Sequence, residues 1–169
     1  MAVTLVVGDI TTQQVDAIVN AANRSVGIGA GVTGAIFAAG GPGLRAECRT
    51  LGGCETGHAK ATGGHDLPAR YVIHAVGPRW SDHSEEMADD LLDGAYERSL
   101  EVAAGLGVRT IAFPCISTGV YGFPRERAAR VAMAAIRRHL ARRPDRFDEV
   151  RIVPFSEPDA LPYDGLVGG

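Results

Sequence analysis

With 169 residues, 46% of them hydrophobic, the chain can build one domain with a sizeable core and leaves little room for a second. A formal net charge of −3 excludes a protein that holds bulk nucleic acid by counterion release, because that mode of binding needs an excess of Lys and Arg. The three cysteines lack the spacing of a disulfide framework or a zinc site, and neither a secretory leader nor an apolar run of about 18 residues is present, so we expect a reduced, cytoplasmic protein without metal or membrane.

The first part of the chain predicts short strands and short helices separated by glycines. Val3–Val7 and Ala17–Val19 are apolar, β-branched runs that end in polar residues, which is typical of buried strands. Val32–Ala39 predicts a helix that ends at the glycines and proline of Gly40–Gly43, and Leu44–Leu51 predicts another.

The rest of the chain alternates strands with longer helices. Strands are predicted at three places, with an edge strand before them: Ala59–Thr62 (edge), Tyr71–Val76, Thr110–Phe113 and Arg151–Phe155. Apolar residues at helical spacing predict an amphipathic helix over Glu85–Ala104. A second helix is predicted from Pro124 to about Leu140, with the proline at its first position. This alternation indicates a central sheet covered by helices on both faces. We expect one domain over residues 1–169, with a tail after about residue 156 that packs only partly.

Two glycine-containing loops precede predicted helices. Gly29–Gly34 matches the dinucleotide pattern GxGxxG, but Asn20–Val26 separate it from the preceding strand and Cys48–Gly57 does not read as the next strand, which disfavours a Rossmann unit. Ser117–Gly122 is the second loop. Backbone N–H groups at such loops can approach an anion with help from the helix dipole, so the pair could hold one diphosphate from opposite sides. The alternative is that both loops are only tight turns between strand and helix.

Several motifs occur together and in the order in which one family carries them: Gly8–Thr11, Val15–Asn23, Gly31–Val32, Tyr71–Pro78 and Ile116–Gly122. Together they resemble the macrodomain family, and within it the MacroD-type ADP-ribose hydrolases. The resemblance spans nearly the whole chain. It implies an α/β fold, a three-layer α/β/α macrodomain with a central mixed, mostly parallel sheet of about six strands. It also implies ADP-ribose binding and hydrolytic removal of ADP-ribose from modified macromolecules, without a cofactor. O-acetyl-ADP-ribose and ADP-ribosylated nucleic-acid ends would suit the same pocket.

The resemblance also assigns roles at the adenine end. Asp9 would accept a hydrogen bond from the adenine amino group, the Ile10 N–H would bind a ring nitrogen, and Phe155 would stack on the base. Two simpler interpretations remain open. Asp9 could be a turn or N-cap residue before Thr11, and Phe155 could be an ordinary core aromatic.

At the other end, the resemblance places Asn23 on the distal ribose, where an amide can donate and accept without ionising. Tyr121 would close over the same ribose. The phosphate amides would come from the two loops, through Gly31, Val32, Thr33, Ser117, Thr118, Gly119 and Val120. Asn23 could instead form only an Asx turn at a strand end, and Tyr121 could be a hydrophobic lid.

Two positions depart from the family pattern. Thr33 stands where these hydrolases usually have an aspartate, and Phe37 stands where they have a histidine. A threonine can orient the attacking water but cannot take its proton, and losing a general base typically costs about 10²–10⁴-fold in rate. We therefore hold Asn23 and Thr33 as the catalytic candidates. A non-catalytic ADP-ribose reader is the alternative. Neither the exposed pair His58 and His65 nor the strand residue His74 completes another catalytic site.

Overall fold

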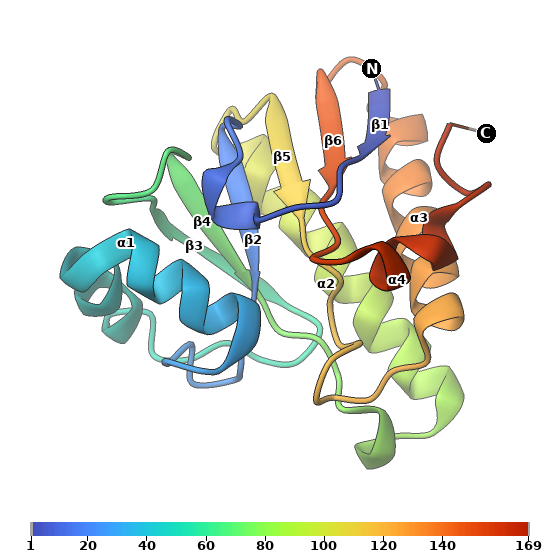
Figure 1. Ribbon diagram of the computed structural model, residues 1–169, viewed down its shortest axis with the longest axis horizontal. Coiled ribbons are helices and arrows are strands. Elements are labelled where there is room, and N and C mark those ends of the chain that lie inside the picture. Colours follow the sequence, from blue (N-terminus) through green and yellow to red (C-terminus); the bar gives the residue numbers. More distant parts are fainter. Residues whose placement is uncertain (1, 169) are drawn as a thin grey trace.

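The computed structural model describes residues 2–168 and shows one six-stranded sheet (Figure 1). The strands lie in the order β1-β6-β5-β2-β4-β3, and all neighbours are parallel except β3 and β4. Their bounds are β1 (Ala2–Leu5), β2 (Ala17–Ala21), β3 (Ala59–Gly63), β4 (Tyr71–Ala75), β5 (Thr110–Phe113) and β6 (Glu149–Ile152). The prediction of a mixed, mostly parallel sheet of about six strands is confirmed, with β3 as the expected edge strand.

Helices cover both faces of the sheet. The long elements are α1 (Gly31–Arg49), α2 (Glu85–Gly105) and α3 (Arg125–Arg142), and the short ones are η1 (Ile10–Thr12), η2 (Trp80–Asp82), α4 (Glu157–Ala160) and η3 (Leu161–Tyr163). Figure 1 shows α1 in front of one side of the sheet and α2 and α3 behind it. None of the helices within residues 2–168 combines the length and apolarity that a membrane crossing requires.

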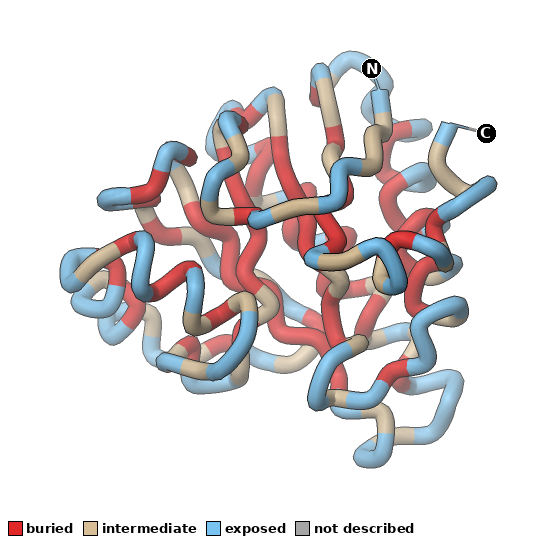
Figure 2. The backbone as a smooth tube through the Cα atoms, viewed as in Figure 1, coloured by how far each residue is buried: buried red, intermediate tan, exposed pale blue. Residues whose placement is uncertain are grey.

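Alternation along the central strands explains the three layers. In β2, Ala17 and Val19 belong to the core that packs against α2 and α3, whereas Ile18 belongs to the core beneath α1. Because successive side chains of a strand point to opposite faces, an uninterrupted apolar strand needs a helical layer on each side. Figure 2 shows these central strands as the most buried part of the chain.

The neighbours β2 and β5 mark the point where the chain direction divides. From β2 the chain passes through α1 on one face, and from β5 it passes through α3 on the other. The loops that follow these two strands therefore leave their carboxyl ends in opposite directions. Such a switch point opens a crevice in which α/β proteins commonly bind ligands.

Several predicted boundaries shift in the structure. The two short helices predicted around Gly40–Gly43 form one element, α1, with a kink where Gly41 adopts φ +78°. β1 is a half-exposed edge strand that ends at Leu5, not a buried strand reaching Val7. β6 ends at Ile152, not Phe155, because Pro154 has no N–H with which to continue the ladder. Pro124 is the N-cap of α3, one position before the predicted first turn.

The tail also packs more firmly than its composition predicts. α4 and η3 follow β6 after residues 153–156, and their residues Ala160 and Tyr163 are buried, the second against the α2–α3 core. Leu166 and Val167 pack partly against the same core. Residues 157–168 thus pack onto the rest of the domain, and Asp159 borders the crevice described next.

Candidate functional site

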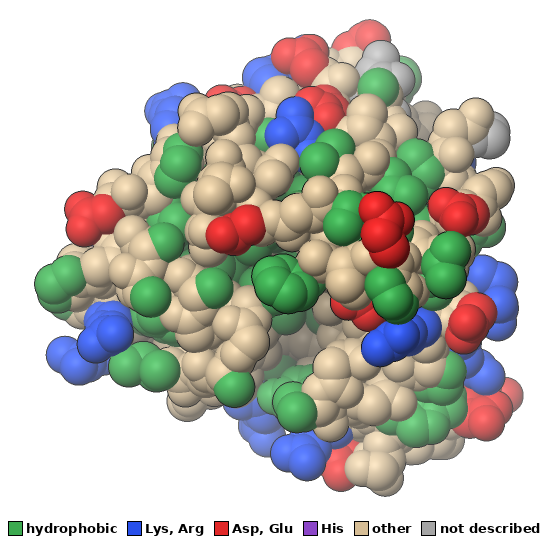
Figure 3. Space-filling view, viewed as in Figure 1, with side chains coloured by type: hydrophobic (Ala, Val, Ile, Leu, Met, Phe, Trp, Pro, Cys, Tyr) green, Lys and Arg blue, Asp and Glu red, His purple; other side chains and the backbone are tan. Residues whose placement is uncertain are grey.

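One elongated groove lies beyond the carboxyl ends of β2, β5 and β6. It consists of two cavities of about 470 and 430 Å³, a size usual for small-molecule sites, which share walls at Gly31, Val32, Cys115 and Gly119. We name them the Asp9 half and the Asn23 half after a residue in each. Figure 3 shows the surface hollowed between the side that carries α1 and the side that carries α3.

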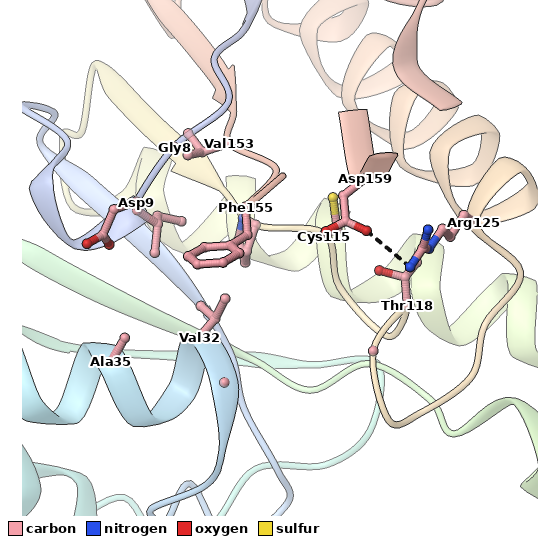
Figure 4. A pocket seen from close by; sticks show the side chains of 14 residues that line it. Gly8, Asp9, Val32, Ala35, Cys115, Thr118, Arg125, Val153, Phe155 and Asp159 are labelled. Atoms are coloured by element: carbon pink, nitrogen blue, oxygen red, sulfur yellow. Dashed lines mark ion pairs between the residues drawn. The ribbon is translucent and has the colours of Figure 1, made fainter. Parts of the chain in front are cut away.

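The Asp9 half contains the three residues expected at adenine, Asp9, Ile10 and Phe155. Asp9 is the N-cap of η1, because its Oδ1 accepts hydrogen bonds from Thr11 N at 2.9 Å and Thr11 Oγ1 at 2.7 Å. Its Oδ2 makes no hydrogen bond within residues 2–168, so the capping role leaves one carboxylate oxygen free. Phe155 is 73% exposed, so the interpretation as a core aromatic is wrong. Figure 4 shows its ring beside Val32 in the cavity.

The first loop ends at the amino terminus of α1. Ala30 is the N-cap and supplies no side-chain hydrogen bond, so the first N–H groups of the helix remain available. Gly31 adopts φ +61°, which favours glycine. A Cβ at Gly34 would lie 2.7 Å from the Gly29 carbonyl oxygen, so the loop can fold this closely over the helix only with glycine there.

The second loop presents both amides and a hydroxyl. Thr118 to Tyr121 make no hydrogen bond through their N–H groups within the described residues, and the loop closes through Phe123 N to Ser117 O at 2.9 Å. Ser117 adopts φ +69°, is buried, and has an Oγ without a hydrogen-bond partner in the part of the chain described. A Cβ at Gly77 would lie 2.1 Å from that Oγ, so Gly77 makes room for it. Gly119, Val120 and Tyr121 of this loop therefore line the Asn23 half with amides unpaired within residues 2–168, while Ser117 Oγ lies buried beside Gly77.

Asn23 lies in that half and is held by its own loop. Its Oδ1 accepts hydrogen bonds from Ser25 Oγ at 2.8 Å and from Gly27 N at 3.0 Å, while its Nδ2 is 3.5 Å from Gly27 O. The side chain thus makes the Asx-type contacts of a strand end. Those contacts fix the amide plane and leave Nδ2 as the more weakly engaged end.

Thr33 lines the same half, but its hydroxyl points toward β2. Thr33 Oγ1 donates to Ala21 O at 2.8 Å and lies 3.1 Å from Asn20 Oδ1. The residue is 7% exposed. The hydroxyl proton is therefore used to join the start of α1 to the end of β2.

A buried polar chain continues behind Thr33. Asn20 Nδ2 donates to His74 Nδ1 at 3.0 Å, and His74 Nε2 lies 3.0 Å from Thr62 Oγ1. Burial lowers the pKa of His74 to about 4, so the ring is neutral and the Asn20 contact places its proton on Nε2. His74 is thus a satisfied core histidine, as the sequence indicates. This hydrogen-bond network of Asn20, His74 and Thr62 lies behind the groove and does not line it.

The Asn23 half contains no acid or imidazole among the described residues that line it. Its titratable side chains are Tyr121 and Cys115. Burial, with a smaller contribution from Asp159, raises the pKa of the Cys115 thiol to about 12, so Cys115 is a thiol and not a nucleophile near neutral pH. Tyr121 is half-buried, and the guanidinium of Arg79 lies 5.5 Å from its ring centroid. Within residues 2–168, His, Cys, Asp and Glu form no group that could hold a metal ion.

Three residues of the groove carry no signal in the sequence. Cys115 follows β5, Arg125 begins α3, and Asp159 lies in α4. Arg125 Nη2 and Asp159 Oδ1 form an ion pair at 3.4 Å across the wall of the Asp9 half (Figure 4). They are far apart in the chain, and no spacing rule could have paired them.

Comparison with known proteins identifies relatives along most of the chain. A family model for the macro domain matches residues 19–132. ADP-ribose glycohydrolase MACROD2 of Xenopus laevis is 52% identical over 92% of this chain, which spans only 37% of that relative. O-acetyl-ADP-ribose deacetylase 1 of Pantoea vagans is 48% identical, with 96% of this chain and 94% of the relative aligned. The crystal structure of a Trypanosoma brucei macrodomain in complex with ADP-ribose has a TM-score of 0.91 at 42% identity, covering 99% of this chain and 69% of the other.

Proposed function

The chain belongs to the macro domain family, and on that premise we propose that it binds ADP-ribose in the groove and hydrolyses the bond between C1″ of the distal ribose and an acceptor group. One observation carries the proposal. Two loops border the same groove, and within residues 2–168 the N–H groups of Thr118 to Tyr121 and the first N–H groups of α1 have no hydrogen-bond partner. That is the donor set a diphosphate needs, at a helix amino terminus where the dipole favours an anion.

The two halves then take the two ends of the ligand. Adenine occupies the Asp9 half, with its amino group on the free Asp9 Oδ2 and its face on the exposed Phe155 ring. The distal ribose occupies the Asn23 half, between Asn23 Nδ2 and Tyr121. The shared wall at Gly31 and Gly119 takes the diphosphate.

Hydrolysis in this site proceeds by positioning. Water adds to C1″, the bond from C1″ to the acceptor oxygen breaks, and the water proton passes to an oxygen of the substrate's own diphosphate. The lining of the Asn23 half, as far as the structure describes it, offers no carboxylate or imidazole for that proton, and Cys115 is held as a thiol. Thr33 holds α1 against β2, and Asn23 fixes the ribose. Orientation alone can supply a large share of a rate enhancement.

The names of the relatives indicate the substrates. MACROD2 is named an ADP-ribose glycohydrolase, and the Pantoea vagans relative an O-acetyl-ADP-ribose deacetylase. The first reaction breaks the glycosidic bond at C1″ and the second breaks an acetyl ester. Both reacting bonds lie at the distal ribose, so we propose the Asn23 half for both. ADP-ribosylated protein is the macromolecular substrate we propose first, with ADP-ribosylated nucleic-acid ends as a further one. The three free cysteines fit the cytoplasmic location we propose.

A non-catalytic reader remains the second candidate, and the hydroxyl of Thr33 facing β2 favours it. Titration calorimetry with ADP-ribose and NAD tests the binding that both candidates share. We expect micromolar or tighter affinity for ADP-ribose and much weaker binding of NAD, because the nicotinamide would crowd Asn23 and Tyr121. Equal affinity for both ligands would contradict a distal-ribose site in the Asn23 half.

A further inference from the structure

The wall of the Asp9 half opposite Asp9 carries a charged pair that the proposed reaction does not use. Arg125 is the first residue of α3, and Asp159 lies in α4. Arg125 Nη2 is 3.4 Å from Asp159 Oδ1, and both side chains line the cavity with Cys115 and Thr118. Figure 4 shows the pair on the far side of Phe155 from Asp9.

The carboxylate is the better-fixed partner of the two. Asp159 Oδ2 accepts a hydrogen bond from Ser156 Oγ at 2.9 Å, and the next residue, Ala160, is buried. The Asp159 side chain is 28% exposed, whereas that of Arg125 is 53% exposed. The tail of the domain thus sets a carboxylate into the groove wall and pairs it with a more exposed guanidinium.

The ion pair lies beside the place where the middle of the ligand would pass. If adenine lies between Asp9 and Phe155 and the diphosphate lies at Gly31 and Gly119, the adenosine ribose must cross the space between them. That space is bordered by the wall with Cys115 and the charged pair. Burial raises the pKa of the neighbouring Cys115 thiol, Asp159 raises it further and Arg125 lowers it, so both charges act on the part of the cavity that Cys115 lines.

From this arrangement we propose that Asp159, held beside Arg125, binds the hydroxyls of the adenosine ribose and makes the groove select ADP-ribose over its 2′-phosphorylated form. The inference rests on the proposed function. A carboxylate accepts hydrogen bonds from vicinal hydroxyls and repels a phosphate group. Dinucleotide-binding folds use the same chemistry, with an acidic residue on a free 2′-hydroxyl and an arginine for a 2′-phosphate. Here Arg125 is already paired with Asp159, so the carboxylate determines which form of the ribose the groove prefers.

The test is calorimetric titration of the full chain with ADP-ribose and with 2′-phospho-ADP-ribose. We expect the wild type to bind ADP-ribose tighter by about tenfold or more, about 1.4 kcal/mol. Asp159→Asn keeps the shape of the side chain but frees Arg125, so the preference should fall to near one or reverse. Arg125→Ala leaves the carboxylate unopposed and should widen the preference.

The ratio of the two affinities separates recognition from damage, because a misfolded groove would weaken both ligands together. Glu157→Gln is the matched control, since Glu157 is an exposed acid of the same short helix outside the groove lining, and its ratio should equal that of the wild type. Equal affinities in the wild type, or an unchanged ratio in Asp159→Asn, would overturn the inference while leaving ADP-ribose binding intact. Failure of the wild type to bind either ligand would overturn this inference and the proposed function together.

Discussion

Thr33 departs from the family pattern but still makes a structural contact at that position. Its hydroxyl donates to Ala21 O and lies beside Asn20, so it joins the helix that follows one phosphate loop to the strand that precedes Asn23. The sequence predicts a residue that orients water. In the structure the hydroxyl proton is donated to Ala21 O, and the water-orienting role stays a prediction.

Replacing Thr33 therefore distinguishes a structural role of its hydroxyl from a catalytic one. Thr33→Ala removes a buried hydrogen bond and should lower the free energy of unfolding by about 1–3 kcal/mol, because Ala21 O loses its donor. Turnover at a temperature where the variant is folded should fall by no more than about tenfold, or 1.4 kcal/mol in the barrier. Thermal unfolding and ADP-ribose release, measured on the same samples, decide the matter. A collapse of turnover with unchanged stability would assign the chemistry to the hydroxyl.

Asp9 has two separable roles, one for each carboxylate oxygen. Asp9→Ala should weaken ADP-ribose binding by about 1–3 kcal/mol and also lose the cap of η1. Asp9→Asn retains a capping oxygen but puts an NH₂ group where the adenine amino group needs an acceptor. Calorimetry should show both variants weakened while the unfolding temperature drops only in Asp9→Ala. Wild-type affinity in both variants would remove Asp9 from the adenine site.

At the scale of elements, the groove depends on how closely the first loop folds over α1. Gly34→Ala would bring a Cβ to 2.7 Å from Gly29 O, so the loop must move away from the helix. We expect ADP-ribose affinity to fall by about tenfold or more, since displaced amides lose their alignment with the phosphates. Gly105→Ala, at the end of α2 where a Cβ meets nothing, is the control and should bind as the wild type does. Equal affinity for Gly34→Ala and the wild type would show that the close approach does not shape the site.

The elements most visible in the sequence are those whose patterns are local. Thr110–Phe113 is observed with the predicted bounds, and α2 differs from its prediction by a single residue, because alternation and helical periodicity act over a few positions. The strand ends at β1 and β6 were misplaced because pairing with neighbours, and the missing N–H of Pro154, set where a ladder stops. Pairing is a property of distant segments and leaves little local trace.

The candidate site divides in the same way. Asp9, Asn23 and both loops could be located because a motif marks each of them, and the structure brings all of them to one groove. Arg125 and Asp159 could not, because only the packing of the tail through Ala160 and Tyr163 brings that carboxylate to α3. The direction in which the Thr33 hydroxyl points could not be predicted either, because it depends on where β2 ends.

For the whole molecule, the neutral His74 makes stability depend on pH. Its pKa is lowered to about 4 by burial, below the usual 6.5, so between these values the unfolded chain binds a proton that the folded chain does not. The free energy of unfolding should therefore fall as the pH drops from 6.5 toward 4, by on the order of 3 kcal/mol. Urea unfolding at pH 7 and pH 4.5 should show a smaller loss for His74→Gln than for the wild type. The exposed His58→Gln is the control, and parallel losses in all three proteins would rule out His74 as the cause.

The measurement that bears most directly on the account is single-turnover release of ADP-ribose from a mono-ADP-ribosylated protein, with enzyme in excess. The account predicts that the wild type releases free ADP-ribose well above the rate without enzyme. It predicts that Asn23→Ala, which loses the amide fixed by Ser25 and Gly27, releases it slower by about 10² or more through misplacement of the ribose. Saturating binding of the modified protein by the wild type, with no release of ADP-ribose, would contradict the account and leave a reader of ADP-ribose in its place.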